Sequence, residues 1–318
     1  MAVLLTGVGY IGAALAQALL RDGARVVAID NGFATDRRAL VALAASERFW
    51  LIEGSVSAPR VVARAFAAEP IDTVYHLAAQ ASAHPRAAPA RYTELTNLSG
   101  PRVVCEAALR HGVRRLVYAS SLRVYGHVLP QRVSEETPYG PQQDLAHLAH
   151  LYGEKLLELY ARQGGLCGVA VRLGVVYGVS PVMKTDPRFM TVPNKFCWQA
   201  ARGEPLEVYA GAAIPTGFIH IDDAVAALRR AAEAPWPEPY QAANAVGECR
   251  TVPDVAALVQ RTAAARGLAV TVRGAEAGAP PAPPVIASRL EAHGWRPRRT
   301  MEESIGAVLD YFVSETRS

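Results

Sequence analysis

A glycine-rich turn near the start of the chain has the residue types and spacing that bind a phosphate. Residues 7–12 read G-V-G-Y-I-G, an apolar run precedes them, and Asp30 ends the next apolar run, 18 residues after Gly12. Such glycines let a pyrophosphate approach the free N–H groups of a helix, and the acidic residue binds ribose hydroxyls while repelling a 2′-phosphate. The pattern predicts a dinucleotide site that prefers NAD to NADP. Its expected contacts are Gly7, Gly9, Tyr10, Ile11, Gly12, Asp30 and Asn31.

The elements that must position this turn alternate between apolar runs and amphipathic stretches. Strand-like runs at 2–7, 24–30, 72–78, 114–121 and 168–178 are separated by helical patterns, among them 97–110 and 145–163. This rhythm predicts an α/β fold with a Rossmann-type doubly wound parallel sheet. Beyond Gly178 the pattern changes. We expect residues 1–178 to form the dinucleotide-binding domain, with 214–235 returning to it, and residues 179–213 and 236–318 to form a smaller C-terminal substrate lobe.

Composition excludes several classes of function. The formal net charge is +4 and the basic residues are scattered, which argues against nucleic acid as a partner. The apolar first twenty residues lack a basic start and contain the glycine turn, so we expect neither a signal peptide nor a membrane span. Four separated cysteines without a C-x-x-C spacing argue against a metal site and favour a cytoplasmic location.

Four further segments carry a family resemblance. They are VYHLAAQ at 74–80, TNLSG at 96–100, ASSLRVYG at 119–126 and FIHIDD at 218–223. In this order they resemble the extended short-chain dehydrogenases/reductases, the NAD-dependent nucleotide-sugar epimerase/dehydratase family. The later motifs at 174–178 and 194–201 are most similar to the UDP-sulfoquinovose synthase-like members. The resemblance implies NAD as cofactor, a homodimer formed through the helices near 97–110 and 145–163, and further cofactor contacts at Leu77, Ala78, Ala79, Asn97 and His150.

The acid/base pair of that family is missing. Its members use a Tyr to take a hydroxyl proton and a Lys four residues later, yet no lysine here has a tyrosine four residues before it. Alignment back from 174–178 places Ala146 and His150 at the two positions. The resemblance therefore implies His150, as a base or as a ribose contact, together with His147 and the retained Ser121, as the catalytic residues.

Tyr152 and Lys155 look like a displaced copy of the lost pair. At about 100° per residue, however, Tyr152 lies roughly 200° round the helix from His150, and Lys155 roughly 180° from Ala146. We expect both side chains to face away from the site.

The substrate side also departs from the family. Thr216 and Gly217 stand where an Arg before FIHIDD binds the diphosphate, and Leu122 and Arg123 stand where dehydratases have an acid pair and decarboxylases a Glu. The expected substrate contacts are Gln80, Arg123, Lys184, Arg188, Asn194 and Lys195.

The first hypothesis is an NAD-dependent epimerase/dehydratase-like enzyme that acts on a sugar or nucleotide sugar through a transient keto intermediate. The alternatives are a catalytically silent NAD-binding partner or regulatory protein, and a non-redox lyase or cyclase that uses the same pocket.

Overall fold

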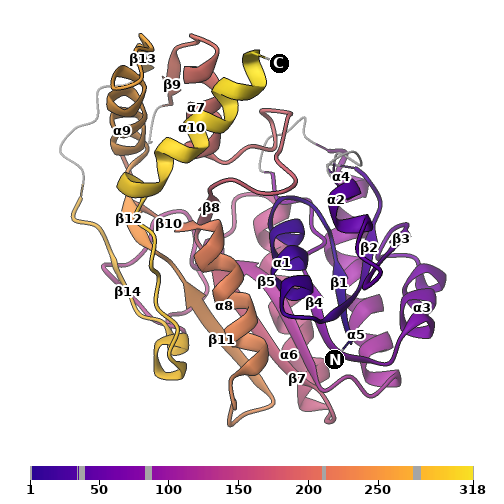
Figure 1. Ribbon diagram of the computed structural model, residues 1–318. Helices are drawn as coiled ribbons and strands as arrows, with labels where there is room; N and C mark the ends of the chain where they lie inside the picture. The colour runs from indigo at the N-terminus through magenta and orange to yellow at the C-terminus, as the bar shows by residue number, and fades with distance from the viewer. Residues whose placement is uncertain are drawn as a thin grey trace.

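A seven-stranded sheet, all of whose pairs are parallel, forms the centre of the molecule (Figure 1). The computed structural model describes residues 2–33, 35, 40–82, 88–209, 213–274 and 281–317. The strand order is β11-β7-β5-β4-β1-β2-β3. The order reverses between β1 and β4, as in dinucleotide-binding sheets, so the predicted Rossmann-type fold is confirmed. The strands are β1 (Ala2–Thr6), β2 (Arg25–Asp30), β3 (Phe49–Glu53), β4 (Ile71–His76), β5 (Arg115–Ser121), β7 (Cys167–Leu173) and β11 (Tyr240–Ala245).

Helices cover both faces of this sheet. Along β1, Val3 and Leu5 belong to the core beneath α1 and α8, whereas Leu4 belongs to the core beneath α3 and α5. Strands buried on both faces must be apolar at every position, which explains their nearly continuous hydrophobic runs. The covering segments are α1 (Tyr10–Arg21), α2 (Val41–Ala44), α3 (Pro59–Ala68), α4 (Ala90–Glu94), the π-helical η2 (Leu95–Ser99), α5 (Gly100–Arg110), α6 (Leu145–Arg162) and α8 (Ile221–Glu233).

The smaller lobe contains short strands and the helices α7, α9 and α10, and these three helices lie together at one end of the molecule (Figure 1). A three-stranded sheet has the order β12-β10-β8, and two strand pairs, β13 with β9 and β14 with β6, complete the lobe and its connection. Its segments are η3 (Leu122–Tyr125), β6 (Arg132–Val133), β8 (Val175–Tyr177), α7 (Val192–Ala201), β9 (Leu206–Val208), β10 (Thr216–His220), β12 (Glu248–Arg250), α9 (Val252–Ala264), β13 (Val272–Gly274), β14 (Val285–Ile286), η4 (Arg289–His293) and α10 (Met301–Arg317).

The lobe boundary at residue 236 differs from the expectation. Residues 236–318 are expected in the smaller lobe, but β11 pairs with β7 at the edge of the main sheet. Within the returning segment 214–235, α8 packs on the main sheet whereas β10 joins the three-stranded sheet. The sequence of β11, YQAANA, consists largely of alanine and lacks the β-branched residues that mark a strand.

A buried ion pair holds α6 against β7. Glu154 is fully buried, and its carboxylate accepts two-pronged hydrogen bonds from Arg172, Nε to Oε1 at 3.0 Å and Nη2 to Oε2 at 2.7 Å. Ser120 and Tyr139 donate to the same carboxylate. A buried charge is tolerated only with such complete pairing. The network therefore fixes the depth and rotation of α6, whose first turns carry His147 and His150.

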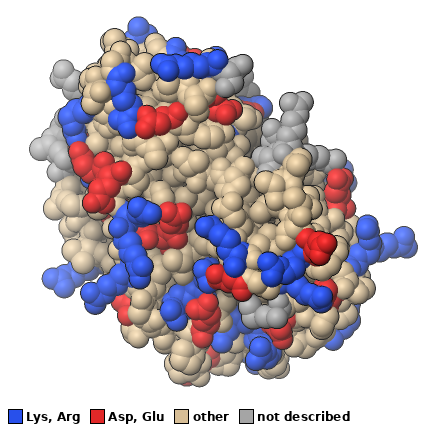
Figure 2. Space-filling model, viewed as in Figure 1, with Lys and Arg blue, Asp and Glu red and all other residues tan. Residues whose placement is uncertain are grey.

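On the face shown in Figure 2, acidic and basic side chains are interspersed. Within the described ranges, no helix combines the length and apolarity needed to cross a bilayer.

Candidate active site

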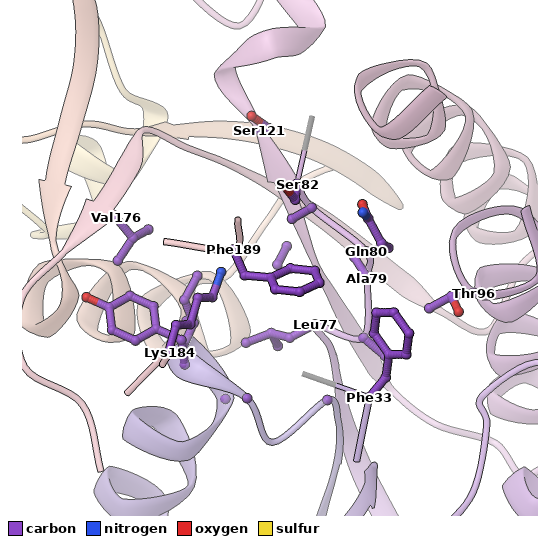
Figure 3. A pocket seen from close by; sticks show the side chains of 18 of the residues that line it. Phe33, Leu77, Ala79, Gln80, Ser82, Thr96, Ser121, Val176, Lys184 and Phe189 are labelled. Carbon is purple, nitrogen blue, oxygen red and sulfur yellow. The ribbon is translucent and has the colours of Figure 1, made fainter. Parts of the chain in front are cut away.

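One cavity of about 470 Å³ lies where the carboxyl ends of the parallel strands meet (Figure 3). The segments after β1, β2, β4, β5 and β7 all line it, because parallel strands end at the same edge of a sheet. Fifteen of the predicted site residues come together there: Gly7, Gly9, Tyr10, Ile11, Gly12, Asp30, Asn31, Leu77, Ala78, Ala79, Gln80, Ser121, Arg123, His147 and His150. Lys184 and Arg188 join them from the loop that precedes α7.

The glycine loop has the geometry of a phosphate site. Gly7 has a φ of +80°, and a Cβ on Gly12 would lie 1.9 Å from the Gly7 carbonyl oxygen, so neither position accepts a side chain. A Cβ on Gly9 would have Thr35 Oγ1 as its nearest neighbour, 3.5 Å away. Gly9 is also the N-cap of α1, and no side chain caps that helix. The first N–H groups of α1 are therefore available to a diphosphate.

Asp30 lies at the end of β2 with its carboxylate held by the surrounding loops. Its Oδ2 accepts from the Val8 N–H at 2.7 Å and from the Thr35 hydroxyl at 3.3 Å, and its Oδ1 accepts from the Gly32 N–H at 2.7 Å. Because Oδ1 has a further lone pair, it keeps capacity for a ribose hydroxyl. These features fit a dinucleotide, with its diphosphate on α1 and its adenosine ribose at Asp30.

His150 is a buried residue of α6 that lines the cavity. Its Nδ1 lies 3.4 Å from the hydroxyl of Tyr118, whose ring stacks on His76. Burial, reinforced by the neighbouring His147, lowers the pKa of His150 to about 4. The imidazole is neutral at pH 7 and a weak base. His150 can therefore form hydrogen bonds with a ligand, but it cannot supply the positive charge of the lysine whose position it occupies.

His147 is better arranged for proton transfer than His150. Its Nδ1 lies 2.6 Å from Oδ2 of Asp144, while Oδ1 of Asp144 accepts from the His147 backbone N–H at 2.8 Å. Burial lowers the pKa of His147, and the Asp144 carboxylate opposes that shift. A carboxylate on Nδ1 holds the neutral ring in the tautomer whose Nε2 accepts a proton.

Asp144 was not expected from the sequence. Its one signal is its place as N-cap of α6, three residues before His147, a position in which aspartate usually serves the helix alone.

Ser121 is the last residue of β5 and Arg123 follows in η3, and both line the cavity together with His147. Ser121 is the N-cap of η3, where its Oγ accepts from the Arg123 N–H at 3.2 Å, so its own hydroxyl proton stays available. Burial lowers the pKa of Arg123. The Arg123 guanidinium contacts His127 through Nη1, 3.0 Å from the ring Nδ1 and 3.3 Å from the backbone oxygen.

Lys184 crosses into the cavity from the smaller lobe (Figure 3). Its Nζ lies 5.9 Å from the ring centre of Tyr10, the first residue of α1, and desolvation lowers the pKa of the amino group to about 8. Arg188, also on this loop, pairs with Asp186. The loop contributes Phe189 too, whose ring meets Phe33 edge to face at 6.0 Å.

Three predicted residues do not line the cavity. Asn97 binds both backbone groups of Gln80 at 2.8 Å and so positions that residue. Asn194 is committed to Gly178 and to the Tyr10 hydroxyl, and Lys195 lies outside the cavity lining. The expected substrate contacts Asn194 and Lys195 thus lie outside the cavity lining. An asparagine at a lobe junction satisfies buried backbone groups first, because leaving them unpaired is costly.

The orientation expected for Tyr152 and Lys155 is confirmed. Tyr152 is 37% exposed, and Lys155 is exposed and pairs with Glu158 on the same helix. Ala146, at the position of the lost tyrosine, is buried outside the cavity lining.

A protein-family model and several known proteins match this chain. The model of the NAD dependent epimerase/dehydratase family matches residues 3–244. UDP-glucuronic acid decarboxylase 1 of Danio rerio is 28% identical over 325 residues, covering 98% of this chain and 73% of the relative. UDP-glucose 4-epimerase of Bacillus subtilis is 28% identical over 239 residues, covering 70% of each.

Solved structures agree with the fold. UDP-glucose 4-epimerase of Thermus thermophilus, in complex with NAD, superposes with a TM-score of 0.83 at 27% identity, covering 98% of this chain and 99% of that one. UDP-glucuronic acid 4-epimerase of Bacillus cereus, in complex with UDP-glucuronic acid and NAD, gives 0.83 at 22% identity, covering 99% and 100%. With the glycine loop, Asp30 and the cavity in place, this chain belongs to the NAD-dependent epimerase/dehydratase family.

Proposed function

We propose that the protein is an NAD-dependent enzyme that acts on a nucleotide sugar through a transient keto intermediate, with His147 as the acid/base group. One observation carries this proposal. The imidazole of His147 is bound by Asp144 at 2.6 Å and lines the same cavity as the glycine loop. The family chemistry needs a proton acceptor in that cavity, and a carboxylate-bound neutral histidine supplies one without tyrosine or lysine.

Each residue of the site has a separate role in the proposed reaction. NAD, when bound, supplies the acceptor for the hydrogen that leaves the sugar carbinol carbon. The α1 N-terminus and Asp30 hold its diphosphate and adenosine ribose, and His150 binds near the other ribose. Ser121 donates a hydrogen bond to the reacting sugar oxygen, while His147 Nε2 takes the hydroxyl proton and returns it when the ketone is reduced again. Reduction on the opposite face inverts that carbon, which is an epimerisation.

The relatives support a nucleotide sugar, since those named above act on UDP-glucose or UDP-glucuronic acid. Epimerisation is favoured over dehydration and decarboxylation, because Leu122 and Arg123 replace the acidic residues that those two reactions require.

We also propose a homodimer that assembles through α6 and works in the cytoplasm. There its four free thiols, Cys105, Cys167, Cys197 and Cys249, would stay reduced.

The test combines cofactor release with turnover. Purified wild-type protein is denatured, the supernatant is assayed for NAD(H), and conversion of UDP-glucose or UDP-glucuronate to the 4-epimer is followed by chromatography. We expect His147→Ala to keep its NAD and to lose about 10²–10⁴-fold in kcat. His111→Ala is the matched control, because His111 is exposed and lies outside the cavity lining. This variant should keep wild-type turnover.

Asp144→Asn tests the positioning of His147. Because the carboxylate raises the pKa of His147, its loss should move the acid limb of the kcat/KM profile to lower pH while reducing kcat. Wild-type turnover in His147→Ala would refute the acid/base assignment. Absence of NAD from the wild type, with no rise in Tm on adding it, would instead favour the silent or non-redox alternatives.

A further inference from the structure

Arg123 lines the cavity, and one hydrogen-bonding edge of its guanidinium is not used by any described residue. Its Nη1 is held by His127, whereas Nε and Nη2 make no hydrogen bond to any residue in the described part of the chain. Nε and Nη2 lie on one edge of the planar guanidinium, with their N–H bonds parallel. That edge matches the two oxygens of a carboxylate. The contact with His127 thus fixes the guanidinium and leaves its bidentate edge for a ligand.

The charge of Arg123 is also uncompensated. No carboxylate of the described ranges lies within 4.0 Å of it, although the side chain is half-buried. The carboxylate of Asp144 acts on Arg123 electrostatically, but both of its oxygens are already bound to His147. A half-buried cation without a counter-ion is costly, and an anionic ligand relieves that cost.

The position of Arg123 indicates which part of a substrate it would contact. Arg123 lies two residues after Ser121, and its charge lowers the pKa of His147, so it stands beside the groups that we assign to the reacting hydroxyl. In a hexuronate, the carboxylate carbon is two bonds from C4, the carbinol carbon. The anomeric phosphate lies across the sugar ring from C4, and so away from these groups.

Resting on the function proposed above, we propose that the substrate is an acidic nucleotide sugar, a hexuronate, whose carboxylate is bound by the Nε and Nη2 edge of Arg123. The arginine then sets specificity for the acidic sugar over its neutral counterpart. It also keeps the carboxylate paired while C4 is oxidised and reduced.

The experiment measures binding by calorimetry to NAD-loaded protein, with UDP-glucuronate and UDP-glucose as probes. The wild type should prefer UDP-glucuronate by roughly tenfold or more in Kd. Arg123→Met should bring the two Kd values to within about twofold by weakening UDP-glucuronate alone. Arg123→Lys, which keeps the charge without the bidentate edge, should retain part of the preference. Arg132→Met, at an exposed arginine on β6, is the matched control and should keep all of it.

Each contrary outcome has its own meaning. Equal wild-type affinities, or a preference that survives in Arg123→Met, would overturn the carboxylate assignment and leave the proposed function standing. Equal losses for both probes in Arg123→Met would place Arg123 on the diphosphate and overturn the inference. The pair glucuronate 1-phosphate and glucose 1-phosphate repeats the comparison without a nucleotide. Failure of all four probes to bind would refute the proposed function itself, and the inference with it.

Discussion

Two neighbouring residues, Ala146 and His147, bear on the proposal that His147 takes over the proton chemistry of the site. Ala146 occupies the position of the family tyrosine but is buried outside the cavity lining, whereas His147 lines the cavity. A tyrosine base needs a nearby cation to lower its pKa. A histidine already titrates near neutrality and needs only a partner that fixes its tautomer. Asp144 is that partner, so loss of the lysine at position 150 is compatible with retained proton transfer.

Lys184 gives a prediction about pH. In the free protein its pKa is about 8, because burial disfavours the charged form. Its Nζ lies 5.9 Å from the ring of Tyr10, the first residue of α1, so we propose that the protonated amine pairs with an anion bound at the glycine loop. NAD affinity should then be full below pH 8 and fall as the pH rises through it. Between pH 7 and pH 9, Kd for NAD should rise up to about tenfold, measured by fluorescence titration.

The controls for Lys184 come from the same region. Lys184→Met should bind NAD more weakly at pH 7 and show no such pH dependence. Lys195→Met, at a lysine outside the cavity lining, should behave as the wild type. A pH-independent Kd in the wild type would show that Lys184 does not contact the cofactor.

Among the elements, the glycine loop and the first turns of α6 line the same cavity. The loop is rigid because its carbonyls and α1 pack too closely for side chains, and α6 is rigid because Glu154 and Arg172 tie it to β7. Precise placement of catalytic groups depends on such support from regular elements.

The glycines of the loop allow a matched comparison. In Gly12→Ala, the new Cβ would meet the Gly7 carbonyl oxygen at 1.9 Å, so the loop must shift, at a cost of about 1–3 kcal/mol in unfolding free energy. We expect a lower Tm and loss of NAD binding. Gly9→Ala has room, since its nearest neighbour is 3.5 Å away, so Tm should hold while the methyl group hinders the diphosphate. Equal Tm values for both variants would contradict this account of the loop.

At the scale of the whole molecule, α6 leaves an apolar face uncovered. Leu148, Tyr152 and Leu159 are 48%, 37% and 55% exposed and recur at helical spacing. The neighbouring α5 does not contribute a comparable stripe, because Val103, Val104 and Ala107 are buried in the internal core. The proposed dimer contact therefore rests mainly on α6.

Light scattering tests this contact. The wild type at micromolar concentration should have twice the mass of one chain, and the pair Leu148→Glu and Leu159→Glu should shift it toward a single chain without lowering the Tm of the core. Val128→Glu, at a 65% exposed residue outside α6, should leave the dimer intact. A monomeric wild type would exclude the proposed assembly.

Local sequence patterns were enough to predict several elements of this protein. Apolar runs separated by helical periodicity predicted the parallel sheet, and the spacing of residues 7–12 and Asp30 predicted the cofactor loop, which the structure places at the strand ends. Helical geometry alone also predicted that Tyr152 and Lys155 face away from the site. These features follow from the backbone period of one segment, or from the fixed edge at which parallel strands end.

Which polar side chains line the cavity, and which bind other parts of the protein, depends on tertiary contacts. In the sequence, Asp144 has only the features of a helix cap, whereas in the structure its carboxylate also binds the His147 ring. Asn194 was predicted to contact the substrate, but in the structure it binds Gly178 and Tyr10. The alanine-rich β11 likewise joins the main sheet because β7 offers it a partner. Partner choice depends on distances between segments that are remote in the chain, and on the depth of burial that shifts each pKa. Neither quantity is encoded in local spacing.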